Sequence, residues 1–302
     1  MSQKLPKNIS ASVRQKLLNR AKAGQRPFNE LAQYYAMERF LYRLSRSAHA
    51  GRFILKGALM LRVWGSPEFR PTMDIDLLGR TSGEETSIAA QIRDVISVEV
   101  APDGLTFNPD SIQTERITET AEYEGIRVRF LCMLDTVKIT MQVDIGFGDA
   151  VFPEPELSDL PVLLDSPAPR LLCYSRESAI AEKFEAMVKL RELNSRMKDF
   201  YDIWLLSRQF DFDGEKLAEA IRLTFERRET GLPDEIVAFS SEFVAAKQIQ
   251  WTAFRNRLQQ DSLPASFPDI INALNIFIRP LIAALSSGTP APGRWTAPGP
   301  WV

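Results

Sequence analysis

The chain has 302 residues, 45% of them apolar and 25% charged, which is typical of a globular protein and excludes a disordered or fibrous one. Its single histidine, His49, and its two cysteines, Cys132 and Cys173, are too few for a multi-histidine zinc site, a cysteine-rich site or a disulfide framework. The net charge of −2 conceals an asymmetry: residues 1–62 carry 13 Lys/Arg against two acids, net +11, and the rest of the chain is net −13. This distribution favours an anionic partner for the N-terminal part, although two oppositely charged faces of one fold would give the same totals.

The rarity of cysteine favours a reducing compartment, and we expect a cytoplasmic protein. The N-terminal sequence MSQKLPKNIS lacks the apolar stretch of a signal peptide. The most apolar long run, residues 270–285, is interrupted by asparagine, arginine and proline. We therefore predict no membrane-spanning segment.

The first hundred residues alternate between helical and strand-like patterns. Apolar spacing predicts a helix over 9–22 and a longer one over 28–48, with Asn29 as a candidate N-cap. Further on, the pattern favours a strand at 53–55, a helix from Gly57 onward, a strand at 73–78 that ends at Gly79, and a helix at 87–95.

The remainder reads as two strands followed by helices. Strands are predicted at 126–131, after a turn at Gly125, and at 137–147. Residues 152–169 are rich in proline and are expected to be extended. Ser175 is a candidate cap for the next helix. Further helices are expected at 198–208, 214–228, 234–259 and 268–285, before a loose tail rich in proline and glycine.

This order of elements predicts an α+β protein in four segments. A mixed-sheet head with N-terminal helices occupies 1–150, and a proline-rich connection occupies 151–170. An all-helical C-terminal domain follows over 171–287, with the tail at 288–302.

Three aspartates carry the strongest chemical signal. Asp74 and Asp76 are two residues apart on a predicted strand, so both side chains face one side while Met73, Ile75 and Leu77 face the other. Asp144 repeats the pattern on a later strand, between Val143 and Ile145. Acids crowded on one face without a neighbouring base are unfavourable unless a cation is bound. Oxygen ligands of this kind suit Mg²⁺, so the three aspartates are predicted metal ligands, although isolated Asp-x-Asp pairs are usually surface acids.

Upstream of these acids stands the sequence Lys56-Gly57-Ala58. A glycine at a turn between strand and helix allows the backbone to approach a phosphate closely. One glycine is a weak signal, and the chain contains neither a P-loop nor a Rossmann glycine motif.

The combination of Gly57, the Asp74-Ile75-Asp76 run and the later Asp144 resembles the nucleotidyltransferase superfamily with a polymerase-β-like palm. More narrowly, the chain resembles the AbiEii/AbiGii toxins of type IV toxin–antitoxin and abortive-infection systems. The matching segments are FILKGALML (53–61), RPTMDIDLLGR (70–80), VDIGFGDAV (143–151), AEKFEAMVKL (181–190) and SRMKDFYDIWLL (195–206). The resemblance implies a nucleotidyltransferase-like head whose active site is completed by the C-terminal domain.

Roles for individual residues follow from this resemblance. It implies that Asp74, Asp76, Lys183 and Asp202 are catalytic, with Lys183 on the nucleotide phosphates. It also implies nucleotide-binding roles for a further set: Lys56, Gly57, Ala58, Thr72 and Arg196. Without the resemblance, Lys183 and Asp202 would read as an ordinary helix salt bridge.

Two positions depart from the family pattern. Ala58 stands where a glycine or serine is usual, which removes a hydroxyl that could contact phosphate. Met73 precedes Asp74 where a polar or basic residue is expected. Neither change removes a predicted metal ligand.

The resemblance implies a toxin that uses Mg²⁺ or Mn²⁺ to transfer a nucleotide from an NTP to an RNA acceptor, with tRNA as one candidate. It also implies a separately encoded antitoxin. Two alternatives remain open at this point: transfer to a protein or small molecule, and a non-catalytic module that only binds NTP.

Overall fold

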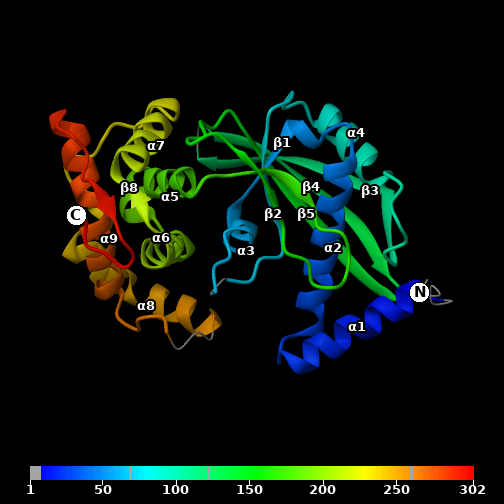
Figure 1. Cartoon of the computed structure of the whole chain (residues 1–302). Coiled ribbons are helices and arrows are strands. Elements are labelled where there is room, and N and C mark those ends of the chain that lie inside the picture. Colours follow the sequence, from blue (N-terminus) through cyan, green and yellow to red (C-terminus); the bar gives the residue numbers. More distant parts are fainter. Residues whose placement is uncertain (1–7, 68–69, 121–122, 259–261) are drawn as a thin grey trace. The chain divides into compact units, whose positions relative to one another are not determined.

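The computed structural model describes residues 8–67, 70–120, 123–258 and 262–302. These residues form two compact units. Unit 1 comprises Met1–Gly148 and Glu156–Cys173, and unit 2 comprises Asp149–Pro155 and Tyr174–Val302. The fold is α+β, with a mixed seven-stranded sheet in unit 1 and a helical unit 2 (Figure 1).

The sheet of unit 1 has the strand order β3-β4-β5-β2-β1-β7-β6. Its strands are β1 (Phe53–Lys56), β2 (Ile75–Gly79), β3 (Leu105–Thr120), β4 (Tyr123–Leu134), β5 (Val137–Phe147), β6 (Glu156–Asp159) and β7 (Arg170–Cys173). β2 runs parallel to β5 and antiparallel to β1, and β1 runs parallel to β7. The central position of β2 therefore brings Asp76 between two neighbouring strands.

Four helices belong to unit 1: α1 (Ile9–Ala23), α2 (Phe28–Arg46), α3 (Met60–Val63) and α4 (Glu85–Ile96). α2 runs across one face of the sheet and packs on β5, β7 and α4 (Figure 1). The contact is apolar: Phe40 of α2 lies 5.4 Å, between ring centroids, from Phe130 of β4. Ile75, Val143 and Ile145 are fully buried on this face, so the alternating aspartates of β2 and β5 project from the opposite face.

Unit 2 contains α5 (Arg176–Leu190), α6 (Met197–Gln209), α7 (Gly214–Arg227), α8 (Ser241–Leu258) and α9 (Phe267–Ser287), together with the short pair β8 (Phe212–Asp213) and β9 (Arg294–Trp295). α5 packs on α7, and α6 packs on α8 and α9. Ser175 caps α5 by accepting a hydrogen bond from the Ser178 amide, as the sequence predicts. By length and composition α9 could cross a membrane, but Leu274 and Leu281 are fully buried in the core of this unit.

Several expectations about local structure are wrong. Gly125 lies inside β4 and marks no turn, and β3 is a 16-residue strand where we predicted none. Asn29 lies within α2, whose N-cap is Pro27 without a side-chain hydrogen bond. Residues 156–159, in the segment we expected to be an extended connection, form β6 and pair with β7.

The C-terminal segment is not loose. Trp295 is 2% exposed, and its indole N–H donates to the Ser207 carbonyl at 2.6 Å. The ring of Trp301 stacks on Phe277, with centroids 5.6 Å apart and planes inclined by 3°. The segment is therefore ordered by the buried Trp295 and the half-buried Trp301, because aromatic packing outweighs the effect of its proline and glycine content.

Candidate active site

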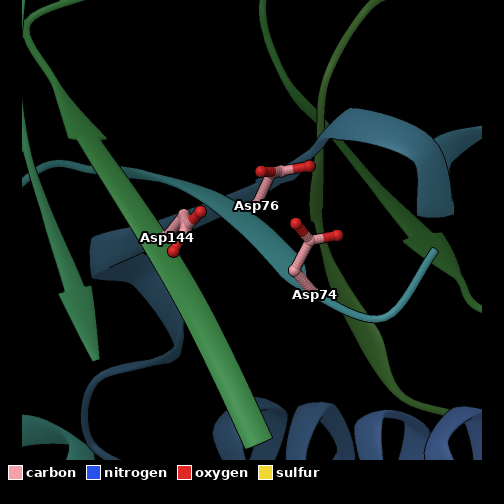
Figure 2. Close-up of side chains that lie close together, drawn as sticks. All are labelled: Asp74, Asp76 and Asp144. Carbon is pink, nitrogen blue, oxygen red and sulfur yellow. The ribbon is translucent and has the colours of Figure 1, made fainter. Parts of the chain in front are cut away.

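Asp74, Asp76 and Asp144 converge on one face of the unit 1 sheet. Each offers a carboxylate oxygen, and these three oxygens all lie within 4.8 Å of one another. Figure 2 shows the three side chains close together, Asp76 from β2, Asp74 from the segment just before β2, and Asp144 from β5. We call these residues the carboxylate cluster.

Strand register explains the convergence. Asp76 and Asp144 are direct partners in the parallel β2–β5 ladder, so their side chains project side by side from the same face. Asp74 precedes the first residue of β2, outside the regular strand.

Gly57 makes room for one member of the cluster. Its φ is +74°, and a Cβ built at this position would lie 1.9 Å from Asp76 Oδ2. The turn after β1 thus brings backbone against the Asp76 carboxylate, which only a residue without a side chain permits. Ala58, the next residue, is buried.

Thr72 orients Asp74. The Thr72 hydroxyl donates a short hydrogen bond to Asp74 Oδ1. Its amide donates to the Tyr34 hydroxyl at 3.2 Å, and both residues are buried. Burial raises the pKa of the Tyr34 phenol, so the group stays neutral at ordinary pH. Thr72, for which the family resemblance implies nucleotide binding, therefore contacts the carboxylate cluster through Asp74.

Arg127 contacts Asp144, and sequence reasoning missed this residue. Its Nε donates to Asp144 Oδ1 and its Nη2 to Asp144 Oδ2, both at 2.8 Å. Gln142 Nε2 also donates to Oδ2, at 3.3 Å. The hydrogen bond to Asp144 raises the pKa of the Arg127 guanidinium, and burial opposes this effect. A signal was present, because Arg127 and Arg129 alternate with Ile126, Val128 and Phe130 on a predicted strand.

The cluster thus has basic neighbours, contrary to the sequence expectation that no base stands beside the acids. Lys56 is the partner of Asp76 in the β1–β2 ladder and lies on the same face. Arg127 is the partner of Asp144 in the β4–β5 ladder. Pairing across strands brought these bases in from segments distant in sequence.

The oxygen spacing fits a divalent cation. Oxygens on opposite sides of a bound Mg²⁺ lie about 4.2 Å apart, twice the usual metal–oxygen distance of about 2.1 Å. Neighbouring ligand oxygens lie about 3.0 Å apart at the same metal–oxygen distance, so the three oxygens, which lie within 4.8 Å of one another, would draw closer together to bind one ion. Asp74, Asp76 and Asp144 supply hard oxygen ligands of the kind this ion prefers.

A second group of charged residues lies in unit 2. Lys183 Nζ is 2.8 Å from Asp202 Oδ2 and 3.1 Å from Asp199 Oδ1. Arg196 Nε is 2.7 Å from Asp199 Oδ2. The Asp199 and Asp202 side chains are 1% and 4% exposed, whereas that of Lys183 is 18% exposed. All three residues that the sequence selected in this unit (Lys183, Arg196 and Asp202) therefore meet around one buried aspartate, Asp199.

Comparison with known proteins gives a match to one family model over residues 39–273, that of the nucleotidyl transferase AbiEii toxin of type IV toxin–antitoxin systems. Two crystal structures of Helicobacter pylori proteins are similar. One, a protein assigned as a nucleotidyltransferase, is 14% identical, with a TM-score of 0.46, covering 86% of this chain and 97% of that one. The other, JHP933, is 13% identical, with a TM-score of 0.47, covering 85% and 97%. Comparison with curated proteins gives no match.

Proposed function

Since this chain belongs to the AbiEii family of nucleotidyl transferase toxins of type IV toxin–antitoxin systems, we propose that it transfers a nucleotide from an NTP to an RNA acceptor in a reaction that needs Mg²⁺ or Mn²⁺. One observation carries the proposal: three carboxylates from β2, its N-terminal flank and β5 offer oxygens within 4.8 Å of one another. Three acids held so closely repel one another; Lys56 and Arg127 offset part of this charge, and a divalent cation on the carboxylate oxygens would offset more of it.

Asp74, Asp76 and Asp144 would hold the metal. When bound there, a divalent ion stabilises charge on the phosphates and favours deprotonation of an attacking hydroxyl. The chain's own residues prepare the ligands: Thr72 fixes Asp74, Gly57 gives room to Asp76, and Arg127 fixes Asp144.

Basic residues are the proposed contacts of the nucleotide. Lys56 lies on the cluster's face of the sheet, and its charge suits a phosphate. For Lys183, Asp202 and Arg196 the assignment rests on the family motif, and their ion pairs in unit 2 show that Lys183 is held in place by two carboxylates. Nucleotide contacts are also proposed for three residues beside the carboxylate cluster: Gly57, Ala58 and Thr72.

The transfer itself is a substitution at phosphorus. The acceptor hydroxyl oxygen forms a bond to the α-phosphorus, and the bond from that phosphorus to the β-bridging oxygen breaks. Pyrophosphate leaves with the electron pair, and the hydroxyl proton passes to a carboxylate of the cluster. Charge develops on the leaving oxygens, which is why positioned cations accelerate such steps.

We further propose that the acceptor is RNA, with tRNA as the first candidate, that the toxin acts in the cytoplasm, and that a separately encoded antitoxin restrains it. Membership of the family supports the antitoxin proposal, because the toxins of this family belong to type IV toxin–antitoxin systems. The RNA assignment draws support from the net charge of +11 in residues 1–62.

The test is a labelling experiment. Purified protein is incubated with each α-³²P-labelled NTP, Mg²⁺ and total cell extract, with and without RNase. We expect a labelled RNA band that RNase removes, that EDTA prevents, and that Asp76→Asn abolishes. Asp165→Asn, at an exposed position of unit 1, is the matched control and should retain activity.

Each other outcome has a meaning. A labelled band that resists RNase would assign the acceptor to protein. No label with any NTP, together with a growth effect that survives Asp76→Asn, would replace the enzyme by a module that only binds NTP.

A further inference from the structure

The exposed charge of α1 is entirely basic. Val13, Leu17 and Ala21 form its buried stripe, and α1 packs on α2 and β4. The helix contains no acid, and its four basic residues are exposed: Arg14, Lys16, Arg20 and Lys22. At 100° per residue, Lys16 and Arg20 lie on one side of the buried stripe, whereas Arg14 and Lys22 lie on the other.

Two of the other basic residues of this part of the chain, Arg39 and Arg43, are committed to internal ion pairs. Arg39 lies 3.1 Å from Glu38, and both side chains are at most 3% exposed. Arg43 forms two hydrogen bonds to Asp103, and both side chains are 8% exposed. These arginines stabilise the core and cannot meet a partner. The exposed basic side chains of this region therefore include Lys16 and Arg20 on one side of α1, Arg14 and Lys22 on the other, and Arg46 and Arg52 elsewhere.

This side of α1 continues toward the carboxylate cluster. Burial is the main cause that lowers the pKa of Arg62; Tyr34 and Glu38 raise it, and the positive charges of Arg26 and Arg20 lower it. Arg26 is also paired with Glu30, at 2.5 Å. Arg26 and Arg62 both lie over the ring of Tyr34, with Cζ 5.7 Å and 4.9 Å from its centroid. We call Lys16, Arg20, Arg26 and Arg62 the basic strip.

The strip ends beside the proposed chemistry. The Tyr34 hydroxyl accepts from the Thr72 amide at 3.2 Å, and the Thr72 hydroxyl donates to Asp74. All these contacts lie within unit 1. A polyanion bound along the strip would thus be led to the first member of the carboxylate cluster.

We propose that the basic strip binds the sugar–phosphate backbone of the RNA acceptor and directs its reacting end toward Asp74. α1 is 15 residues long, about 22 Å at 1.5 Å per residue, which spans several phosphates. RNA fits better than a lipid surface, because Val13, Leu17 and Ala21 of α1 are buried against unit 1 and Ile9 and Leu18 are half-buried, so α1 has no large apolar side chain fully exposed for insertion into a bilayer. This inference rests on the proposed function, of which it specifies the acceptor-binding surface.

The test compares two double variants of one helix. Lys16→Gln/Arg20→Gln removes two charges from the strip, and Arg14→Gln/Lys22→Gln removes two charges from the other side of α1. Binding of a fluorescein-labelled RNA hairpin with a single-stranded 3′ end is measured by anisotropy, without NTP, over a range of salt concentrations. Thermal melting checks that both variants fold.

We expect the strip variant to bind the hairpin roughly tenfold or more weakly at 0.1 M salt, and the salt slope to fall by about 1.5 to 2. The Arg14/Lys22 variant should change affinity by less than about threefold. Equal losses in both variants, or no loss in either, would overturn the proposal. So would a strip variant that loses binding to phosphatidylserine vesicles but retains binding to the hairpin.

The outcome is separable from that of the proposed function. If wild-type protein transfers nucleotide to RNA and the strip variant shows an unchanged KM for RNA, the strip is refuted and the enzyme stands. If no transfer occurs but hairpin binding depends on Lys16 and Arg20, the strip stands and the enzyme does not.

Discussion

Arg127 binds both oxygens of the Asp144 carboxylate, through Nε and Nη2 at 2.8 Å each. Asp144 is at the same time the member of the carboxylate cluster that β5 contributes. A guanidinium and a divalent cation would therefore share one carboxylate. The guanidinium fixes the direction of the side chain, and its positive charge opposes a second cation close by.

Replacing Arg127 should strengthen metal binding. In Arg127→Gln the repulsion between guanidinium and metal disappears, and we expect the Kd for Mn²⁺ to fall by roughly fivefold, as about 1 kcal/mol of like-charge repulsion is removed. The measurement is titration with Mn²⁺ followed by electron paramagnetic resonance.

Arg129→Gln is the control for this prediction. Arg129 is on the same face of β4, but its partners are Glu115, at 3.0 Å, and Gln142, not Asp144. Its affinity for Mn²⁺ should change little. Weaker Mn²⁺ binding in Arg127→Gln would show instead that orientation of Asp144 outweighs repulsion.

Alanine substitutions at two glycines distinguish the cost of backbone strain from that of a clash with Asp76. Gly57 and Gly65 have nearly the same φ, +74° and +72°, but a Cβ at Gly57 would meet Asp76 Oδ2 whereas a Cβ at Gly65 would meet nothing within 4 Å. Gly65→Ala should therefore cost only the left-handed strain, about 1 kcal/mol of unfolding free energy. Gly57→Ala should cost more and also displace Asp76.

The readouts are urea unfolding and nucleotidyl transfer. We expect transfer by Gly57→Ala to fall at least about a hundredfold, because a shift of about 1 Å in a catalytic group suffices for that. Gly65→Ala should retain transfer. Similar activity in the two variants would contradict a role for Gly57 in seating Asp76.

The carboxylate cluster was predictable from sequence because its geometry is mostly local. Alternation with the buried Ile75 and Leu77 puts Asp76 on the polar face of β2, and the same alternation puts Asp144 on the polar face of its own strand. The expectation that Met73 faces the core is wrong, because Asp74 and Met73 precede β2 and Met73 is 53% exposed. Pairing of these two strands then brings the acids together. A local period of two therefore predicts the orientation of Asp76 and Asp144 but not the position of Asp74.

Features that depend on pairing between distant segments were missed. Arg127 reaches Asp144 through the β4–β5 register, which no short-range pattern specifies. Similarly, Trp295 and Trp301 pack on Phe277, a contact made by side chains far apart in sequence. The proline and glycine content of residues 288–302 led to the prediction of a loose tail, because composition does not show which tryptophan side chain is buried.

The two cysteines should be chemically silent in the folded protein. Cys132 is fully buried and Cys173 is 4% exposed, and burial raises the pKa of each thiol from 9.0 to about 12. At pH 8 both are protonated and shielded, so we expect no reaction with Ellman's reagent until urea unfolds the chain.

The same shifts predict a loss of stability in alkali. Because the folded pKa exceeds the unfolded one, the contribution of each thiol is complete below about pH 9 and is lost as pH rises toward 12. Cys132→Ala should flatten the decline between pH 9 and 10.5 in urea unfolding. A decline equal to that of the parent protein would assign it to other groups.

Lys183, for which we propose a role in nucleotide binding, should also stabilise the folded protein. Its ammonium faces Asp199 and Asp202, whose side chains are at most 4% exposed. Lys183→Met would remove the ammonium from both buried acids, whereas Arg196 would stay beside Asp199, and this loss should cost roughly 3 kcal/mol or more of unfolding free energy. Lys216→Met, at an exposed position of α7, is the control and should cost less than about 0.5 kcal/mol.

A double variant identifies the cause of this loss. Asp202→Asn removes one of the two charges that Lys183 neutralises, so Lys183→Met/Asp202→Asn should be more stable than Lys183→Met alone. Recovery of about 1 kcal/mol would show that uncompensated buried charge, rather than lost packing of the lysine stem, destabilises the single variant. If the losses of unfolding free energy in Lys183→Met and Asp202→Asn simply add in the double variant, lost packing of the lysine stem is the cause.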